Sequence, residues 1–270
     1  DSFIEKVRAA VKRVGPEKFL LGEVWEDATT KFGFDKRRTY LLGKGLDSVM
    51  NYPFKNAVLD FVKGKPAEQA INEIMTICEH YPAPAMDTAL NFLSTHDTER
   101  ALTVIADEPA NGRGREWQSG RCVTGDAYEE GMLKLRMAYA IIYTLPGVPC
   151  LYYGDEIGMQ GYRDPFNRGY YCWDSHEKRL RPVLAQLAQL RHTCEAFHSG
   201  ALRVLRADGG VLHYQRIGLV ETAEIIVNRT EHIIVEPLAS GKHTEVNPMG
   251  FTIVVEEVGH NPNHSYYDYK

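Results

Sequence analysis

Two carboxylates in this sequence each stand at the end of a strand-like apolar run. Glu23 lies near the end of the first run, within residues 19–27. Asp97 follows His96 at the end of the second run, residues 89–97. In a parallel α/β architecture the carboxyl ends of the strands share one face, where the connecting loops open. Two carboxylates raised toward one face are the groups that glycosidic bond cleavage requires, so the pattern favours that chemistry.

The elements that must position these carboxylates alternate between helices and strands through the first 199 residues. Apolar residues recur at helical spacing in five stretches. These are residues 2–14, 54–62, 66–80, 129–145 and 176–197, with a further helical segment at 98–105. Strand-like segments end near Glu23, Tyr52, Leu93 and Tyr153. The alternation predicts four parallel strands joined by crossover helices, with a long polar loop at residues 107–128.

The hydrophobic pattern of the chain changes after Gly200. Short alternating segments separated by turn residues run to residue 258, which predicts a small antiparallel β domain. Residues 259–270 are polar and rich in tyrosine, and predict a loosely ordered tail. We therefore expect a catalytic α/β unit at 1–199, a β-sandwich domain at 200–258 and a tail at 259–270.

The composition of the chain argues against several classes of binding partner. The chain has 270 residues, 44% of them apolar, and a net charge of −5. Nucleic acid and anionic membranes attract basic faces, so neither is expected as a partner. The cysteine count of 5 is odd and no CxxC pair occurs, which argues against a disulfide framework or a zinc site. The cysteine usage favours a reducing, cytoplasmic compartment, and secretion stays open as the alternative.

Three segments carry a resemblance to a known family, and a fourth adds a looser match. They are Gly22-Glu23-Val24-Trp25, Phe92-Leu93-Ser94-Thr95-His96-Asp97, residues 147–158 (GVPCLYYGDEIG), and Asp164-Pro165-Phe166-Asn167-Arg168. In this order, and followed by a β domain, they resemble the alpha-amylase superfamily, glycoside hydrolase family 13. The resemblance is greatest to its neopullulanase and cyclomaltodextrinase members.

The resemblance implies a fold and a gap. Members have a (β/α)8 TIM barrel followed by a C-terminal β-sandwich, and the four strands here would be the fifth to the eighth. The segment of the fourth strand, which carries the nucleophile aspartate in this family, has no match in the chain. A retaining mechanism needs that group to form its glycosyl-enzyme intermediate. The chain is therefore expected to be the C-terminal half of the barrel and inactive on its own.

The resemblance also implies roles at the cleavage point. Glu23 would be the general acid/base, a role that needs a protonated carboxyl near neutral pH. Asp97 would stabilise the oxocarbenium-like transition state, although an aspartate before Thr98 is also a natural helix N-cap. His96 would hydrogen-bond hydroxyls of the sugar. Trp25 is either a stacking platform for the leaving sugar or ordinary packing.

Four further residues have weaker assignments. Asp164 and Arg168 would bind the adjoining sugar, or would form a plain ion pair in a loop. Asp155 and Glu156, at the end of the last parallel strand, are expected to be structural groups behind the site. No cofactor is predicted, and calcium stays open because calcium sites in this family often lie in the part that has no match here.

The implied activity is retaining hydrolysis of α-1,4-glucosidic bonds in maltodextrin, cyclodextrin, pullulan or starch. A half barrel leaves strand edges uncovered, so we expect it to pair with the missing N-terminal half-barrel or with another copy of itself. Two alternatives remain open. One is a non-catalytic amylase-like partner subunit, and the other is a carbohydrate-binding module built on the β domain.

Overall fold

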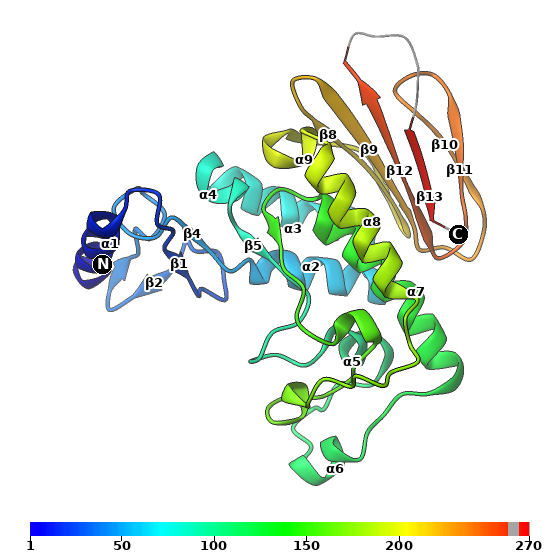
Figure 1. The fold of residues 1–270 in the computed structure, drawn as a ribbon, viewed down its shortest axis with the longest axis horizontal. Coiled ribbons are helices and arrows are strands. Elements are labelled where there is room, and N and C mark those ends of the chain that lie inside the picture. Colours follow the sequence, from blue (N-terminus) through cyan, green and yellow to red (C-terminus); the bar gives the residue numbers. More distant parts are fainter. Residues whose placement is uncertain (259–264, 270) are drawn as a thin grey trace.

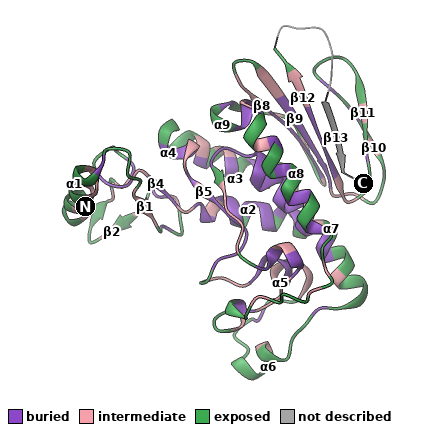
Figure 2. Ribbon diagram, viewed as in Figure 1, coloured by how far each residue is buried: buried purple, intermediate pink, exposed green. Residues whose placement is uncertain are grey.

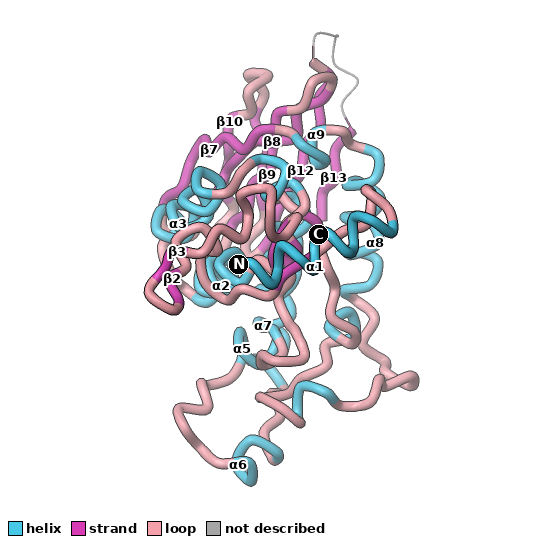
Figure 3. The backbone as a smooth tube through the Cα atoms, turned by 90° about the vertical axis from the view of Figure 1, so that its left-hand side faces the viewer, coloured by secondary structure: helices cyan, strands magenta, loops and turns pink. Residues whose placement is uncertain are grey.

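The chain forms three regions that follow one another in sequence. The computed structural model describes residues 1–258 and the backbone of 265–269. In Figure 1 a small N-terminal lobe projects from a layer of helices, and a β-sheet covers one side of that layer. The side view in Figure 3 shows the sheet above the helices and the loops around α6 (Arg115–Ser119) below them. The catalytic-type motifs lie in the first two regions.

Four short strands form the parallel arrangement that the sequence predicts. They are β1 (Leu21–Gly22), β4 (Ser48–Val49), β5 (Leu90–Asn91) and β6 (Val148–Pro149). The parallel pairs β1–β4 and β5–β6 are joined by a parallel bridge between Met50 and Leu90. The side chains of Asn51 and Asn91 also hydrogen-bond across this junction at 2.9 Å. The order is therefore β1-β4-β5-β6, and within the described residues β1 and β6 have no strand on their outer sides.

The main helices form where apolar residues recur at helical spacing. They are α2 (Tyr52–Lys63), α3 (Ala67–His80), α7 (Gly125–Thr144) and α8 (Leu180–Thr193). Figure 2 shows that α2 and the C-terminal part of α7 are largely buried, and both contribute to the main hydrophobic core. The helix predicted at 98–105 is α5 (Ala101–Ala106), which packs against α7. These helices hold the parallel strands in place from one side.

The predicted boundaries fail in two stretches. Residues 107–128 are not a continuous loop, because they include α6 and the first turn of α7. The single helix predicted over 176–197 is divided into α8 and α9 (Ala196–Ser199). Before α8 the Glu177 carboxylate accepts the Arg179 amide at 2.9 Å, and after it the Glu195 amide donates to Glu221 at 2.8 Å. The two carboxylates accept hydrogen bonds from backbone amides that would donate to backbone carbonyls if the helix were longer. Helix α4 (Ala83–Asp87) and the hairpin of β2 (Phe32–Gly33) and β3 (Lys36–Arg37) are not predicted by the sequence pattern.

The β region is a five-stranded antiparallel sheet in the order β13-β12-β9-β8-β7. Its strands are β7 (Ala201–Asp208), β8 (Val211–Ile217), β9 (Glu221–Asn228), β12 (Gly250–Glu257) and β13 (Ser265–Tyr269). A hairpin of β10 (Ile234–Pro237) and β11 (His243–Val246) packs on its outer face. The expectation of a loose tail is wrong for residues 265–269, because β13 pairs with β12 and continues the sheet. The rest of the predicted tail, 259–264 and 270, lies outside the described residues.

The inner face of the sheet and the helices share one hydrophobic core. The cluster includes helix residues such as Ile141 and sheet residues such as Ile225 and Phe251. At the same contact the buried Arg216 side chain donates to the carbonyl oxygens of Thr144 (2.8 Å) and Gly200 (2.9 Å). A separate β domain from residue 200 stays a prediction, but the described contacts bind it tightly to the helices.

Helix α1 (Ser2–Val14) forms as predicted, but its apolar face is only partly covered. None of its residues is buried, and Phe3 and Val14 are 75% and 79% exposed. Figure 2 shows this helix as largely exposed. An amphipathic helix normally buries such a stripe against a neighbouring element. Within residues 1–258 and 265–269, none of the helices is long and apolar enough to cross a membrane.

Candidate functional site

Glu23 lies directly after β1, and two neighbouring side chains hold it. Trp25 Nε1 and the Tyr52 hydroxyl each donate a hydrogen bond of 2.9 Å to Glu23 Oε1. The rings of Trp25 and Tyr52 stack with centroids 4.3 Å apart and planes 13° apart. Glu23 itself is exposed, and Trp25 is about half exposed. The carboxylate is therefore oriented by two donors and remains open on its other side.

Tyr52 connects the two carboxylates that the sequence singles out. It begins α2 directly behind β4, which lies between β1 and β5 in the strand order. Burial raises the pKa of Tyr52, and the charges of Glu23 and then Asp97 raise it further, while Thr95 opposes the rise. Both carboxylates therefore act on one phenol. The structure brings Glu23 and Asp97 to the same end of two parallel strands, β1 and β5, that lie on either side of β4.

The second half of the site is a chain of charged groups around Asp97. Asp97 contacts His96 Nε2 at 3.2 Å and Arg168 Nη2 at 3.3 Å. Arg168 Nε also lies 3.2 Å from Asp164 and donates to the His96 carbonyl at 2.9 Å. All four side chains are between one-third and three-fifths exposed. Asp97 is therefore flanked by two cationic or hydrogen-bonding groups on the open face.

Asp155 lies buried behind this open face. Its Oδ2 accepts hydrogen bonds from Ser94 (2.6 Å) and Tyr139 (2.7 Å), and its Oδ1 lies 3.1 Å from the fully buried Arg100. Burial raises the pKa of Asp155 to about 6, although the hydrogen bonds and Arg100 oppose the rise. Arg100 also donates to the Tyr153 carbonyl at 2.7 Å. The buried pair of Asp155 and Arg100 links the segment after β5 to the segment after β6. This agrees with the structural role expected for Asp155.

Two residues of the site, Tyr52 and Asn167, are not predicted as site residues by the sequence pattern. Tyr52 was assigned only to the end of a short strand, yet it follows β4 much as Glu23 follows β1. That equivalent place after a parallel strand was a usable signal. Asn167 lies in η2 (Phe166–Arg168) and contacts the turn that carries His96 and Asp97. Its place inside the fourth motif was the only hint.

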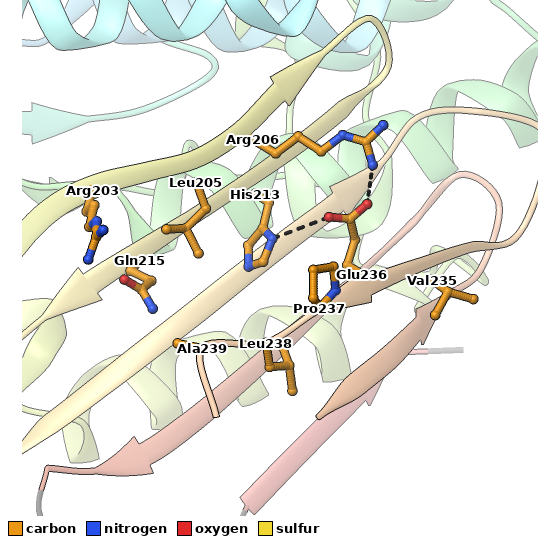
Figure 4. Close-up of a pocket in the computed structure, with 10 residues that line it drawn as sticks. All are labelled: Arg203, Leu205, Arg206, His213, Gln215, Val235, Glu236, Pro237, Leu238 and Ala239. Carbon is orange, nitrogen blue, oxygen red and sulfur yellow. Dashed lines mark hydrogen bonds and ion pairs between the residues drawn. The ribbon is translucent and has the colours of Figure 1, made fainter. Parts of the chain in front are cut away.

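A second polar cluster lies in the β region, away from the site. Figure 4 shows Glu236 between Arg206 and His213, in a groove of about 660 Å³ next to the β10–β11 hairpin. His213 Nε2 also lies 3.0 Å from Glu224 Oε2, and all three of His213, Glu224 and Glu236 are buried. Burial alone would raise the pKa of Glu224, but hydrogen bonds from His213 and the Ala239 amide lower it. The carboxylates face their arginine and histidine partners, and the described residues that line the groove include no phenylalanine, tyrosine or tryptophan.

No group of three or more His, Cys, Asp or Glu side chains in the described part of the chain is arranged to hold a metal ion. The five cysteines are unpaired. The polar groups that the candidate site offers for catalysis and binding are therefore carboxylates, an imidazole and a guanidinium.

Parallel strands with carboxylates at their ends, followed by an antiparallel sheet, are the features of barrel-type glycoside hydrolases. The profile described as "Alpha amylase, catalytic domain" matches residues 1–181. The chain therefore belongs to the alpha-amylase family, and within it the chain is neopullulanase- and cyclomaltodextrinase-like.

Individual relatives agree with this placement. The chain is 33% identical to a cyclomaltodextrinase of Geobacillus thermopakistaniensis over 87% of its own length and 36% of that protein. It is 31% identical to neopullulanase 2 of Thermoactinomyces vulgaris over 77% of its length and 31% of that protein. A solved structure, the cyclic alpha-maltosyl-(1→6)-maltose hydrolase of Arthrobacter globiformis, shares the fold with a TM-score of 0.79 at 24% identity. That match covers 95% of this chain and 53% of the other. The chain thus spans about a third of these two curated relatives.

Proposed function

We propose that this chain supplies the general acid/base and a transition-state-stabilising carboxylate to a retaining hydrolase of α-1,4-glucosidic bonds. Glu23 is the acid/base, and Asp97 stabilises the oxocarbenium-like transition state. His96 binds sugar hydroxyls, Trp25 stacks on the leaving sugar, and the Asp164–Arg168 pair binds the adjoining sugar. Maltodextrin, cyclodextrin, pullulan and starch are the substrates that the relatives and the site favour together.

One observation carries this proposal. Tyr52 donates to Glu23, and the charge of Asp97 helps to raise its pKa, so both carboxylates lie near one phenol between the ends of β1 and β5. A pyranose that binds between these carboxylates meets an acid on one side and a negative charge on the other. Retaining enzymes place the acid and the nucleophile about 5–5.5 Å apart across the bond. The four parallel strands then correspond to the fifth to eighth of the barrel, and the nucleophile belongs to the fourth.

The test is turnover of a chromogenic maltoside by the chain alone and after addition of the polypeptide that supplies strands one to four. We expect turnover only in the mixture. Glu23→Gln in the mixture should lower kcat by about 10²–10⁴-fold, the usual contribution of a general acid. Asp97→Asn should lower kcat with little change in KM. Maltooligosaccharide binding without turnover in both preparations would instead support a binding subunit and overturn the proposal.

We also propose that the exposed part of the apolar face of α1 binds the missing half-barrel. Phe3 and Val14 expose apolar side chains to solvent, and within residues 1–258 and 265–269 no strand pairs with the outer edge of β1 beside them. Exposed apolar stripes and open strand edges are features of surfaces that pair with another chain.

Size-exclusion chromatography with light scattering tests this second proposal. The double variant Phe3→Ser, Val14→Ser should leave the melting temperature unchanged but weaken association with the complementary half. Leu219→Ser, at an equally exposed residue of the β8–β9 turn, is the matched control and should associate normally. Association with the complementary half that persists in the double variant would show that the contact lies elsewhere.

A further inference from the structure

A buried amide behind the site holds the turn that carries His96 and Asp97. Asn167 is fully buried, although its neighbour Arg168 is open to solvent. Its Nδ2 lies 2.8 Å from the carbonyl oxygens of both His96 and Thr98, and 3.3 Å from that of Thr95. One side chain on the loop after β6 therefore contacts three backbone carbonyls on the turn after β5.

These contacts fix the role of the amide. Carbonyl oxygens repel one another unless a donor lies between them, and a side-chain amide offers two N–H groups. The two contacts of 2.8 Å use both hydrogens, and Thr95 shares one of them. The Oδ1 atom of Asn167 is buried without a hydrogen-bond partner in the described structure. Exchanging the two amide atoms would set Oδ1 against the three carbonyls, so Nδ2 is the atom that must face them.

We propose that Asn167 is a positioning residue for Asp97 and His96, an inference that rests on the proposed function. The amide holds the peptide group before His96 and the peptide group before Asp97, and these determine where both side chains point. Arg168 assists from the surface through the His96 carbonyl and the Asp97 carboxylate. A displacement of about 1 Å in a catalytic geometry costs about 10²-fold in rate, so a small movement of the turn is enough to be measured.

The chain contains a matched control for a purely structural role. Asn228 is also fully buried, and its Nδ2 donates to the carbonyls of His232 (2.8 Å), Val246 (3.1 Å) and Asn247 (3.1 Å). It lies in the β region, on β9, and belongs to no part of the proposed site. Replacing either asparagine by alanine removes the same kind of group from the same depth of burial.

The experiment compares Asn167→Ala, Asn167→Asp and Asn228→Ala. Hydrogen exchange is measured on the chain alone, and kcat and KM are measured in whichever preparation turns over a maltoside. We expect Asn167→Ala to speed exchange within residues 92–101 and to lower kcat by about 10–100-fold at nearly constant KM. Asn167→Asp should be worse, because it sets a carboxylate against three carbonyls. Asn228→Ala should lower the melting temperature while kcat stays unchanged.

Two results would overturn the inference. One is a normal kcat for Asn167→Ala in a preparation that turns over substrate. The other is unchanged exchange of residues 92–101 in that variant. If no preparation turns over substrate, the proposed function fails. The exchange measurement on the chain alone then decides separately whether Asn167 holds the turn.

Discussion

At the scale of single residues, Asp155 shows how a buried group supports an exposed site. Its carboxylate bonds Ser94, directly ahead of the segment that carries Asp97, and it pairs with Arg100 just beyond that segment. Arg100 in turn holds the carbonyl of Tyr153 on the neighbouring loop. The exposed Asp97 carboxylate therefore depends on buried hydrogen bonds made beneath its turn, where water does not compete.

Asp155 should make stability depend on pH in a particular direction. Its pKa rises from an ordinary 3.8 to about 6 on folding, so the folded state binds more protons than the unfolded state between these values. Stability from this group is complete below about pH 4 and is lost as pH rises toward 6, by up to about 3 kcal/mol. Asp155→Asn removes this dependence. Urea unfolding of both proteins from pH 4 to 7 checks it, and parallel curves would contradict the assignment.

At the scale of elements, the sequence predicts best where a periodic pattern coincides with burial. The apolar spacing of α2, α3 and α7 predicted helices because each buries that face in the core. The parallel strands were recognised from apolar runs and their alternation with helices, although only two residues of each form regular ladders. The break between α8 and α9 was not predictable, because the carboxylate of Glu221 that binds the Glu195 amide is distant in sequence.

The same limit applies to the site. Glu23, His96 and Asp97 were found because each follows an apolar run. Tyr52 and Asn167 were missed because their importance depends on which strands and loops become neighbours. A side chain that acts through a backbone carbonyl of another loop leaves no pattern in its own segment.

The β10–β11 hairpin gives a prediction at this scale. It is fixed to the sheet partly by Glu236, which pairs with His213 on β8 and with Arg206 on β7. Glu236→Gln keeps the shape but removes a buried charge, so it should destabilise the protein by about 1–3 kcal/mol. Glu245→Gln, on the exposed side of β11, should change stability by less than about 0.5 kcal/mol. Chemical denaturation measures both, and equal stabilities would show that the buried cluster does not hold the hairpin.

At the scale of the whole molecule, the helices and the sheet form one core. Burial lowers the pKa of Arg216 to about 10, and its guanidinium bonds carbonyls at the end of α7 and at the start of β7. Thr144 and Tyr214 hydrogen-bond to each other beside it. The sheet therefore packs directly on the helical layer and shares its core. This shared core argues against a β region that acts as a free-standing carbohydrate-binding module.

Arg216→Met tests this coupling. The substitution leaves the carbonyls of Thr144 and Gly200 without their donors, so we expect a loss of about 2–4 kcal/mol. Far-UV and near-UV circular dichroism should still report a single transition, because the two regions unfold together. Arg203→Met, at an exposed residue of β7, should stay within about 0.5 kcal/mol. Two separate transitions in the parent protein would show that the sheet folds independently.

The uninterrupted core has a consequence for how this gene can be recombined. A recombination crossover near residue 200, where the helical region gives way to the β region, would join helices from one parent gene to strands from another. Side chains that fit across Thr144, Tyr214 and Arg216 would then have to match by chance. Chimaeras with other family members should therefore fold only when the helices and the strands that meet at this contact come from the same parent.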